Sequence, residues 1–165
     1  MPSRTLLIVY HSETGGTAQM ARAAARGAER AEGLRVRLLH ADLAGPDDLL
    51  AAQGYLFATP ENLAAIAGVM KAFFDRCYYP VLGRIQARPY ALLVCAGSDG
   101  SNAVRQAERI ATGWRLRKVT ESRIVCTHAQ TPEAILAPKQ IADADLQACA
   151  DTGEALGQGL VMGLF

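Results

Sequence analysis

Hydrophobic residues follow two alternating patterns along this sequence. Apolar runs typical of strands occur at residues 6–10, 34–40, 54–59 and 90–96, and a more polar run occurs at residues 122–127. Between these runs, apolar residues recur every three or four positions, which predicts helices over residues 17–32, 66–77, 101–114 and 143–160. A short helix is expected to begin after Pro46, and Tyr78-Tyr79-Pro80 is expected to end the helix that starts at Ile66.

Five strands separated by helices predict a doubly wound α/β fold. Parallel strands need long crossover connections, and the helices in those connections cover both faces of the sheet. No internal repeat, low-complexity tract or linker interrupts the pattern, so residues 1–165 are expected to form one domain. In such sheets ligands bind beyond the carboxyl ends of the strands, where the winding reverses direction. This rule selects the loops at residues 11–17, 59–65 and 97–102 as the candidate site.

Charge and composition exclude several classes of function. The chain has 17 basic and 16 acidic residues, a net charge of +1, and both signs are spread along it, so neither nucleic acid nor a membrane surface is expected as a partner. The opening apolar run is far shorter than the ~20 residues of a membrane span. No signal peptide is recognisable, which predicts a cytoplasmic protein without membrane insertion.

The cysteines offer no metal-binding pattern. Cys77, Cys95, Cys126 and Cys149 lie far apart, without a C-x-x-C pair or a neighbouring histidine at metal-ligand spacing. Buried, reduced thiols are therefore expected, because free cysteine behaves as a small hydrophobic residue. No metal site is predicted.

The first loop has the chemistry of a phosphate cradle. In the sequence SETGGT, three hydroxyl side chains accompany Gly15 and Gly16, which permit several amide N–H groups to turn inward at a helix start. Such amides and the helix dipole favour an anion. The loop has no lysine or arginine, which excludes a nucleoside-triphosphate loop and suits a single terminal phosphate held without a counter-ion. The alternative is a plain strand-to-helix turn in which Ser12 or Thr14 caps the helix.

The sequence resembles the flavodoxin-like family. The stretch IVYHSETGGTAQMA is similar to that family's FMN phosphate loop at Ile8, Val9, Tyr10, Ser12, Gly15, Thr17 and Ala21. It departs from the pattern at Ala24, where an aliphatic residue is usual, and at Glu13, whose carboxylate is expected to point outward from a phosphate. The stretch FATPENLAAIAGVMKAFFDR resembles NAD(P)H-dependent FMN reductases and flavin quinone reductases, in the Thr-Pro segment and in the pattern Lys71, Phe73, Asp75 and Arg76.

This resemblance implies a three-layer sandwich around a five-stranded parallel sheet of order 2-1-3-4-5. It also implies an FMN site built from His11, Ser12, Glu13, Thr14, Gly15, Gly16, Thr17, Thr59, Pro60, Glu61, Asn62, Leu63, Gly97, Ser98, Asp99 and Gly100. The first loop would hold the ribityl phosphate, and the other two would run along the edges of the isoalloxazine. The alternatives are a helix start with Glu61 near its N-terminus, and a third loop in which Ser101 or Asn102 caps the next helix.

The resemblance favours a reductase over an electron carrier. The stretches TPENLAA and GSDGSN contain no aromatic residue that would cover the flavin, so NAD(P)H or a flat acceptor could stack on it. The implied reaction is ping-pong hydride transfer from NAD(P)H through FMN to a quinone or a similar small-molecule acceptor, with no residue nominated as catalytic. Tyr78 and Tyr79 could meet a neighbouring subunit in a homo-oligomer, or pack at the sheet edge.

Two alternatives to the reductase follow from the same sequence. One is a non-catalytic flavodoxin-type protein that carries electrons to a partner or regulates it. The other is a phosphoacceptor receiver domain, which needs acidic residues at the first and third strand ends. His11 and Thr59 stand there instead, and we set this alternative aside.

Overall fold

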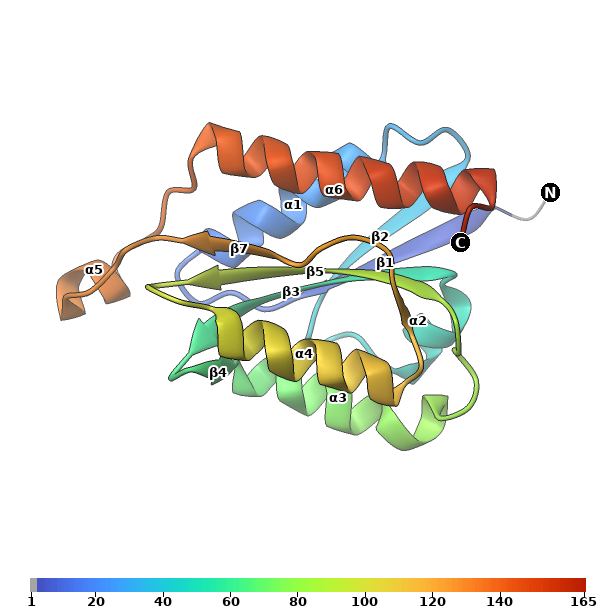
Figure 1. Cartoon of the computed structure of the whole chain (residues 1–165), viewed down its shortest axis with the longest axis horizontal. Coiled ribbons are helices and arrows are strands. Elements are labelled where there is room, and N and C mark those ends of the chain that lie inside the picture. The colour runs from blue at the N-terminus through green and yellow to red at the C-terminus, as the bar shows by residue number, and fades with distance from the viewer. Residues whose placement is uncertain (1–2) are drawn as a thin grey trace.

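A parallel β-sheet runs through the middle of the molecule, and helices cover both of its faces (Figure 1). The computed structural model describes residues 3–165. The strands are β1 (Arg4–Tyr10), β2 (Leu34–His40), β3 (Gly54–Asn62), β4 (Ala65–Ile66), β5 (Pro89–Ala96), β6 (Arg117–Lys118) and β7 (Arg123–Cys126). The helices are α1 (Gly16–Ala28), α2 (Pro46–Ala51), α3 (Gly68–Val81), α4 (Ser101–Gly113), α5 (Pro132–Leu136) and α6 (Asp143–Met162).

The order of the sheet confirms the predicted fold class and refines the strand count. The strands lie in the order β2-β1-β3-β5, and β6 and β7 both pair in parallel with the outer edge of β5. The fifth position of the predicted order 2-1-3-4-5 is therefore shared by two short strands rather than one. With β4, which pairs with β3, the sheet has seven strands where five were expected.

Two apolar layers sandwich the sheet, because successive side chains of a strand point to opposite faces. In β1, Leu6 and Ile8 pack toward α1 and α6, whereas Leu7 and Val9 pack toward α3 and α4. All four side chains are fully buried. The alternation is invisible in the sequence, where both faces read as one apolar run, and it places β1 in the centre of the domain.

Helices α1 and α6 approach each other more closely than side chains would allow. A Cβ atom on Gly27 would lie 1.9 Å from the carbonyl oxygen of Ala150, and one on Gly153 would lie 1.9 Å from that of Ala24. The two glycines therefore let the helix backbones pack directly against each other. This contact fixes the position of α1, which carries the first loop at its N-terminal end.

The helices depart from the prediction in their bounds and by one additional helix. Helix α1 ends at Ala28 rather than at residue 32. Helix α3 begins at Gly68 rather than at Ile66, which lies in β4, and it ends at Val81, one residue beyond the Tyr78-Tyr79-Pro80 stretch where its end was expected. Proline at the last turn removes a single N–H group, while Val81, which is fully buried, anchors that turn in the core. Helix α5 was not predicted, since none of its residues is buried and it has no apolar periodicity.

The second candidate loop is a β-hairpin rather than irregular chain. Strand β3 runs on to Asn62 and pairs antiparallel with β4, which places Asn62 opposite Ala65. The two turn residues, Leu63 and Ala64, have φ angles of 50° and 62°. Two-residue hairpin turns need such left-handed angles, which glycine and asparagine adopt more readily than leucine and alanine. The hairpin stands at the carboxyl end of the sheet, beside α4 (Figure 1).

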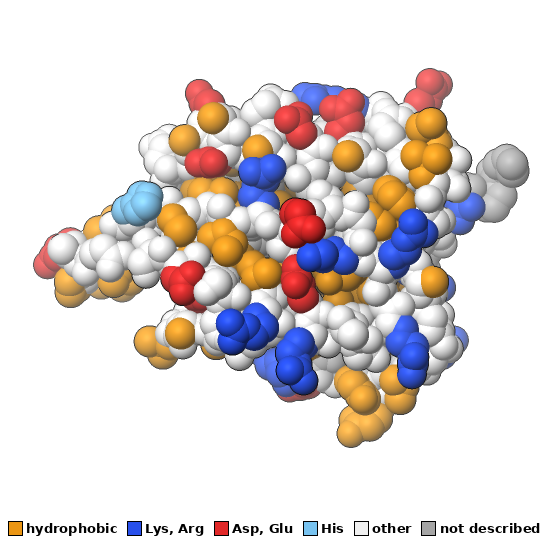
Figure 2. Space-filling model, viewed as in Figure 1, with side chains coloured by type: hydrophobic (Ala, Val, Ile, Leu, Met, Phe, Trp, Pro, Cys, Tyr) orange, Lys and Arg blue, Asp and Glu red, His pale blue; other side chains and the backbone are white. Residues whose placement is uncertain are grey.

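None of the helices within residues 3–165 combines the length and apolar character that crossing a bilayer requires. On the face shown in Figure 2, acidic and basic side chains are interspersed over the surface. The segment that contains α5 projects from the body of the molecule as an arm and carries apolar side chains at its outer end (Figures 1 and 2).

Candidate functional site

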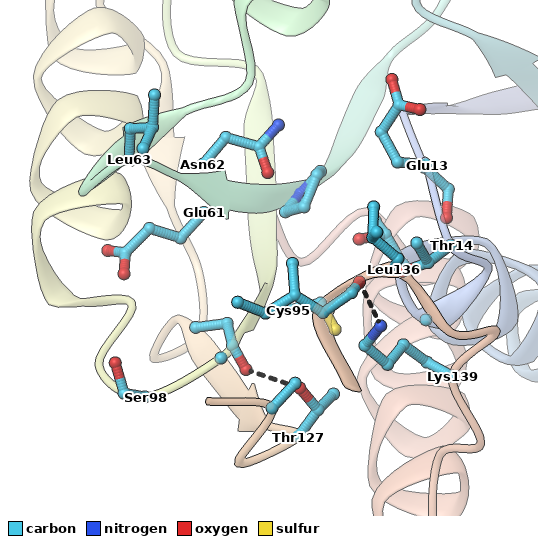
Figure 3. Close-up of a pocket in the computed structure, with 18 of the residues that line it drawn as sticks. Glu13, Thr14, Glu61, Asn62, Leu63, Cys95, Ser98, Thr127, Leu136 and Lys139 are labelled. Atoms are coloured by element: carbon cyan, nitrogen blue, oxygen red, sulfur yellow. Dashed lines mark hydrogen bonds between the residues drawn. The ribbon is translucent and has the colours of Figure 1, made fainter. Parts of the chain in front are cut away.

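A cleft of about 690 Å³ opens at the carboxyl ends of the central strands. Its lining comes from four segments: the first loop, the β3–β4 hairpin, the end of β5 with the following loop, and the connection between β7 and α6. Figure 3 shows Glu61, Asn62 and Leu63 on one side, Thr14, Leu136 and Lys139 on the other, and Cys95 between them. The three loops selected from the sequence therefore converge on one cavity.

The first loop presents main-chain N–H groups that the protein leaves free. Among the described residues, the amides of Glu13, Thr14, Gly16 and Thr17 donate to no protein acceptor, while that of Gly15 donates to Ser12 Oγ at 3.2 Å. Gly15 precedes α1 with a φ of 94°, a left-handed conformation that glycine adopts without strain, and Gly16 and Thr17 directly after it line the cleft. The loop thus combines free amides with the positive end of a 13-residue helix.

The hairpin is held against α4 by three polar side chains. Glu61 Oε1 accepts a hydrogen bond from the amide of Gly100 at 3.0 Å, and Asn102 Nδ2 donates to the carbonyl oxygen of Ala64. Gln106 Oε1 accepts from the amide of Ile66 at 2.9 Å. Glu61 therefore does lie at a helix N-terminus, as the alternative interpretation expected, but the helix is α4 rather than α3. These bonds fix the hairpin as a wall of the cleft.

Hydrogen bonds between neighbouring residues stabilise the third loop. Asp99 accepts from both the amide and the hydroxyl of Ser101, at 3.2 and 2.9 Å, so Asp99 rather than Ser101 or Asn102 caps the start of α4. Gly100 has a φ of 85°, and a Cβ atom there would lie 2.7 Å from Ile124 Cγ2. Gly97 and Ser98 face the cleft.

Most of the predicted site residues line this cleft. They are Ser12, Glu13, Thr14, Gly16, Thr17, Pro60, Glu61, Asn62, Leu63, Gly97 and Ser98. The Glu13 side chain is 70% exposed, with Oε1 3.3 Å from His11 Nε2, and its orientation away from a phosphate stays a prediction. Whether these residues contact FMN stays a prediction.

The structure places the remaining predicted residues, His11, Gly15, Thr59, Asp99 and Gly100, outside the lining. The buried ring of His11 lies with Nδ1 3.2 Å from His40 Nε2 and with Nε2 3.3 Å from Glu13 Oε1. The Thr59 hydroxyl is buried and bonds main-chain groups of Pro60 and Ala67. The side chains of His11 and Thr59 therefore stabilise the loops through contacts outside the cleft.

Sequence reasoning missed the fourth wall of the cleft, which is the connection between β7 and α6. Its lining residues are Thr127, Ala129, Gln130, Ile135, Leu136 and Lys139. Gln130 Nε2 donates to the carbonyl oxygen of Gly97, and the Lys139 amide donates to that of Thr14 at 2.8 Å. Nothing in the local sequence predicts these contacts, because they join segments up to 125 positions apart (139 minus 14). Only the position of this segment directly after the last strand could have drawn attention to it.

Cys95 lies in the floor of the cleft, next to Thr17. Burial raises the pKa of its thiol, and the neighbouring Thr17 hydroxyl partly opposes that shift. A raised pKa keeps the thiol neutral and a poor nucleophile near pH 7. Cys95 therefore contributes shape rather than reactivity. A Cβ atom on Gly16 would lie 2.8 Å from its sulfur, so the first loop rests tightly on this side chain.

Solved structures with the same architecture define the class of protein. A flavodoxin from the domain Archaea superposes with a TM-score of 0.78 at 18% identity, over 95% of this chain and 99% of that one. A WrbA-like flavodoxin from Agrobacterium tumefaciens gives a TM-score of 0.71 at 20% identity, over 97% and 99% of the two chains. At these identities the likeness shows the fold alone. The chain has the flavodoxin-like fold, with its cleft at the switch point of the sheet.

Sequence comparison then assigns the family. Residues 46–131 match the family described as NADPH-dependent FMN reductase, and the chain belongs to it. A flavodoxin from Aquifex aeolicus is 37% identical over 94 residues, which are 57% of this chain and 49% of that protein. An NAD(P)H dehydrogenase (quinone) from Acidithiobacillus ferrooxidans is 33% identical over 43% of this chain and 46% of that protein. The chain thus spans about half the length of the curated relatives it matches.

Membership of this family makes FMN the cofactor, and the cleft fits it. The phosphate of FMN needs hydrogen-bond donors without competing acceptors, and the free amides of the first loop supply them. The flat ring needs a slot, and the hairpin and the third loop, which both line the cleft, would form the two walls of that slot. The volume lies within the range of about 300–1,000 Å³ of small-molecule sites.

Proposed function

We propose that this chain is an FMN-dependent oxidoreductase that uses NAD(P)H to reduce quinones or similar flat small molecules. The single observation that carries the proposal is the composition of the cleft: free amides at one end, and no aromatic side chain among the lining residues of the described chain. When bound, FMN accepts a hydride from a nicotinamide and passes the electrons to an acceptor. An aromatic cover would block such stacking, whereas an open cleft permits it.

The residues of the chain bind FMN and orient its ring. The hydroxyls of Ser12, Thr14 and Thr17 and the free amides of their loop bind the phosphate. The side chain of Asn62, at the exposed end of β3, offers an amide to the ring edge, and Pro60 stiffens the strand beneath it. No lining residue is nominated as an acid or a base, because hydride transfer through a flavin needs placement more than proton transfer.

The mouth of the cleft supports an apolar acceptor. Leu63 at the hairpin turn, with Ile135 and Leu136 of α5, lines the cleft while remaining 102%, 52% and 77% exposed. Exposed aliphatic side chains on opposite rims of a cleft lose that exposure when a flat apolar molecule lies between them. This arrangement favours quinone-like acceptors over strongly charged ones.

Anaerobic spectroscopy tests the proposal. The purified chain, mixed with FMN and separated from excess, should be yellow, and NADPH or NADH should bleach the flavin absorption within seconds. Adding a benzoquinone should restore the colour. A chain that cannot be loaded with FMN, or a loaded chain inert to both nucleotides, would contradict the proposal.

The similarity to the Aquifex aeolicus flavodoxin supports a second candidate, a protein that carries electrons between partners. Such a carrier would bind FMN equally well but would not be reduced by either nucleotide. The same titration therefore separates the two functions. A cytoplasmic location belongs to the proposal, since the cysteines are all free and NAD(P)H is an intracellular reductant. A homo-oligomer is also proposed, to be checked by light scattering, because Tyr78 and Tyr79 are 42% and 81% exposed on α3.

A further inference from the structure

The charges around the cleft are uneven. Among the lining residues of the described chain, the charged side chains are Glu13, Glu61 and Lys139. The negative charges of Glu13 and Glu61 disfavour the binding of an anion in the cleft. The Glu61 carboxylate also accepts a hydrogen bond from the amide of Gly100. Lys139 is the single lysine or arginine in the lining. A phosphate group bound at the first loop has therefore one cation within the cleft to offset its charge.

The main chain of Lys139 is fastened to the first loop. Its amide donates to the carbonyl oxygen of Thr14 at 2.8 Å, and Gln19 Nε2 donates to the carbonyl oxygens of both Gly15 and Lys139, at 3.0 and 2.8 Å. A Cβ atom on Gly16 would lie 3.4 Å from Lys139 Cβ. The lysine stem thus starts beside the first loop, and Figure 3 shows Lys139 on the same side of the cleft as Thr14.

The ammonium group of Lys139 donates hydrogen bonds to carbonyl oxygens of an exposed segment. Lys139 Nζ donates to the carbonyl oxygens of Ile135 and Ala137 at 2.8 and 2.6 Å, at the end of α5. Helix α5 has no buried residue and projects from the body of the molecule, so these carbonyls can bond water instead (Figure 1). A lysine side chain rotates about four flexible bonds and binds phosphate as a point charge. Moving Nζ from these carbonyls to a phosphate at the first loop therefore requires a rotamer change, and water replaces Nζ at the two carbonyl oxygens.

We propose that Lys139 is the counter-ion of the cofactor phosphate, contributed to the first loop by the connection between β7 and α6. The inference rests on the proposed binding of FMN and differs from the expectation, drawn from the first loop alone, of a phosphate held without a counter-ion. It also links α5 to the cofactor, because Lys139 releases the end of that helix when it turns to the phosphate.

Riboflavin has the same ring as FMN and no phosphate. Comparing the binding of the two ligands therefore distinguishes a charge contact between Lys139 and the phosphate from a packing role of Lys139. The dissociation constants of FMN and riboflavin are measured by quenching of flavin fluorescence for the wild type, Lys139→Met, Lys139→Gln and Lys139→Arg. Losing one charge-assisted hydrogen bond should weaken FMN binding about 10- to 100-fold in the Met and Gln variants and leave riboflavin binding within about twofold. Arg should retain most of the affinity. Lys71→Met is the matched control, since Lys71 pairs with Asp75 on α3 and lies outside this cleft.

Salt supplies a second readout. FMN binding by the wild type should weaken as salt rises from 50 to 500 mM, and less so in the Met variant, because exposed charge pairs are screened. Unchanged FMN affinity in the Met and Gln variants would overturn the inference, as would equal losses for FMN and riboflavin, which indicate packing. A wild type that binds riboflavin but not FMN would overturn it as well. A wild type that binds neither flavin would instead overturn the proposed function, and this inference with it.

Discussion

Replacing Gly153 by alanine should separate helices α1 and α6. The new Cβ atom would lie 1.9 Å from the carbonyl oxygen of Ala24, whereas real Cβ atoms essentially never come closer than 3.0 Å. The shortfall of 1.1 Å between these distances cannot be absorbed by a side-chain rotation, because the obstructing atom belongs to the backbone of α1. The helices must move apart along the line of this contact.

The size of the stability loss follows from the packing contacts that weaken when the two helices separate. A radial gap of 0.5–1 Å forfeits roughly a quarter to a half of the dispersion energy of each contact across an interface. Overpacking usually costs about 1–3 kcal/mol, and a backbone clash belongs at the upper end of that range. We expect a loss of about 3 kcal/mol in the free energy of unfolding, which lowers the melting temperature by roughly 6–12 °C in a chain of this length.

Urea unfolding and thermal melts measure the loss, with Gly113→Ala as the control. Gly113 is also a helical glycine, at the end of α4, and an added Cβ atom there meets nothing within 4 Å. The control should leave stability unchanged or raise it by up to about 1 kcal/mol through helix propensity. Gly27→Ala places the same clash on the opposite helix, 1.9 Å from the Ala150 carbonyl oxygen, and should reproduce the loss.

The affinity for FMN tests whether the helix contact also positions the cofactor loop. Because α1 begins at the first loop, its displacement should weaken FMN binding about tenfold in Gly153→Ala, while Gly113→Ala binds as the wild type does. Stability of Gly153→Ala within about 0.5 kcal/mol of the wild type would refute the close approach of the two helices.

Four further substitutions address the candidate site, the hairpin and the core. Thr17→Val and Thr14→Val should each weaken FMN binding about tenfold, on the order of 1.5 kcal/mol for a hydroxyl bonded to a charged group, with riboflavin unaffected; equal affinity for FMN in both variants would refute the phosphate assignment. Ala64→Gly should raise the free energy of unfolding by about 0.5–1 kcal/mol, and with it the urea midpoint, because glycine adopts a φ of 62° without strain. The control Ala65→Gly, in the neighbouring strand, should lower the urea midpoint. Tyr55→Phe should cost about 1–2 kcal/mol at pH 7, because Tyr55 donates to a main-chain carbonyl at 2.6 Å in the core. Burial raises the pKa of Tyr55 from 10.0 to about 12, so the stability it contributes is present below pH 10 and is lost as pH rises toward 12. The difference between the wild type and Tyr55→Phe in urea unfolding should accordingly narrow over that interval, and a constant difference would contradict the burial of a neutral tyrosine.

The sequence by itself determined the class of fold and three of the four segments that line the cleft. Apolar runs and helical spacing are local properties, so the doubly wound class and the loops at the carboxyl ends followed from general rules for parallel sheets, whereas the strand order was implied by the resemblance to the flavodoxin-like family. The first loop was recognisable for the same reason, because its hydroxyls and glycines are adjacent in the chain. The free amides that the structure presents there agree with that interpretation.

Only the tertiary structure decided which charges and walls complete the site. The left-handed turn at Leu63 breaks the preference for glycine or asparagine, so local sequence predicted a loop where a hairpin stands. Lys139 meets the first loop through a contact with Thr14 across 125 positions (139 minus 14), and no periodicity or motif encodes such a distance. Local patterns report which residues share an element, whereas the position of a side chain in the cleft depends on how separate elements pack. For that reason the candidate phosphate loop could be predicted from the sequence, whereas the position of Lys139 beside it could not.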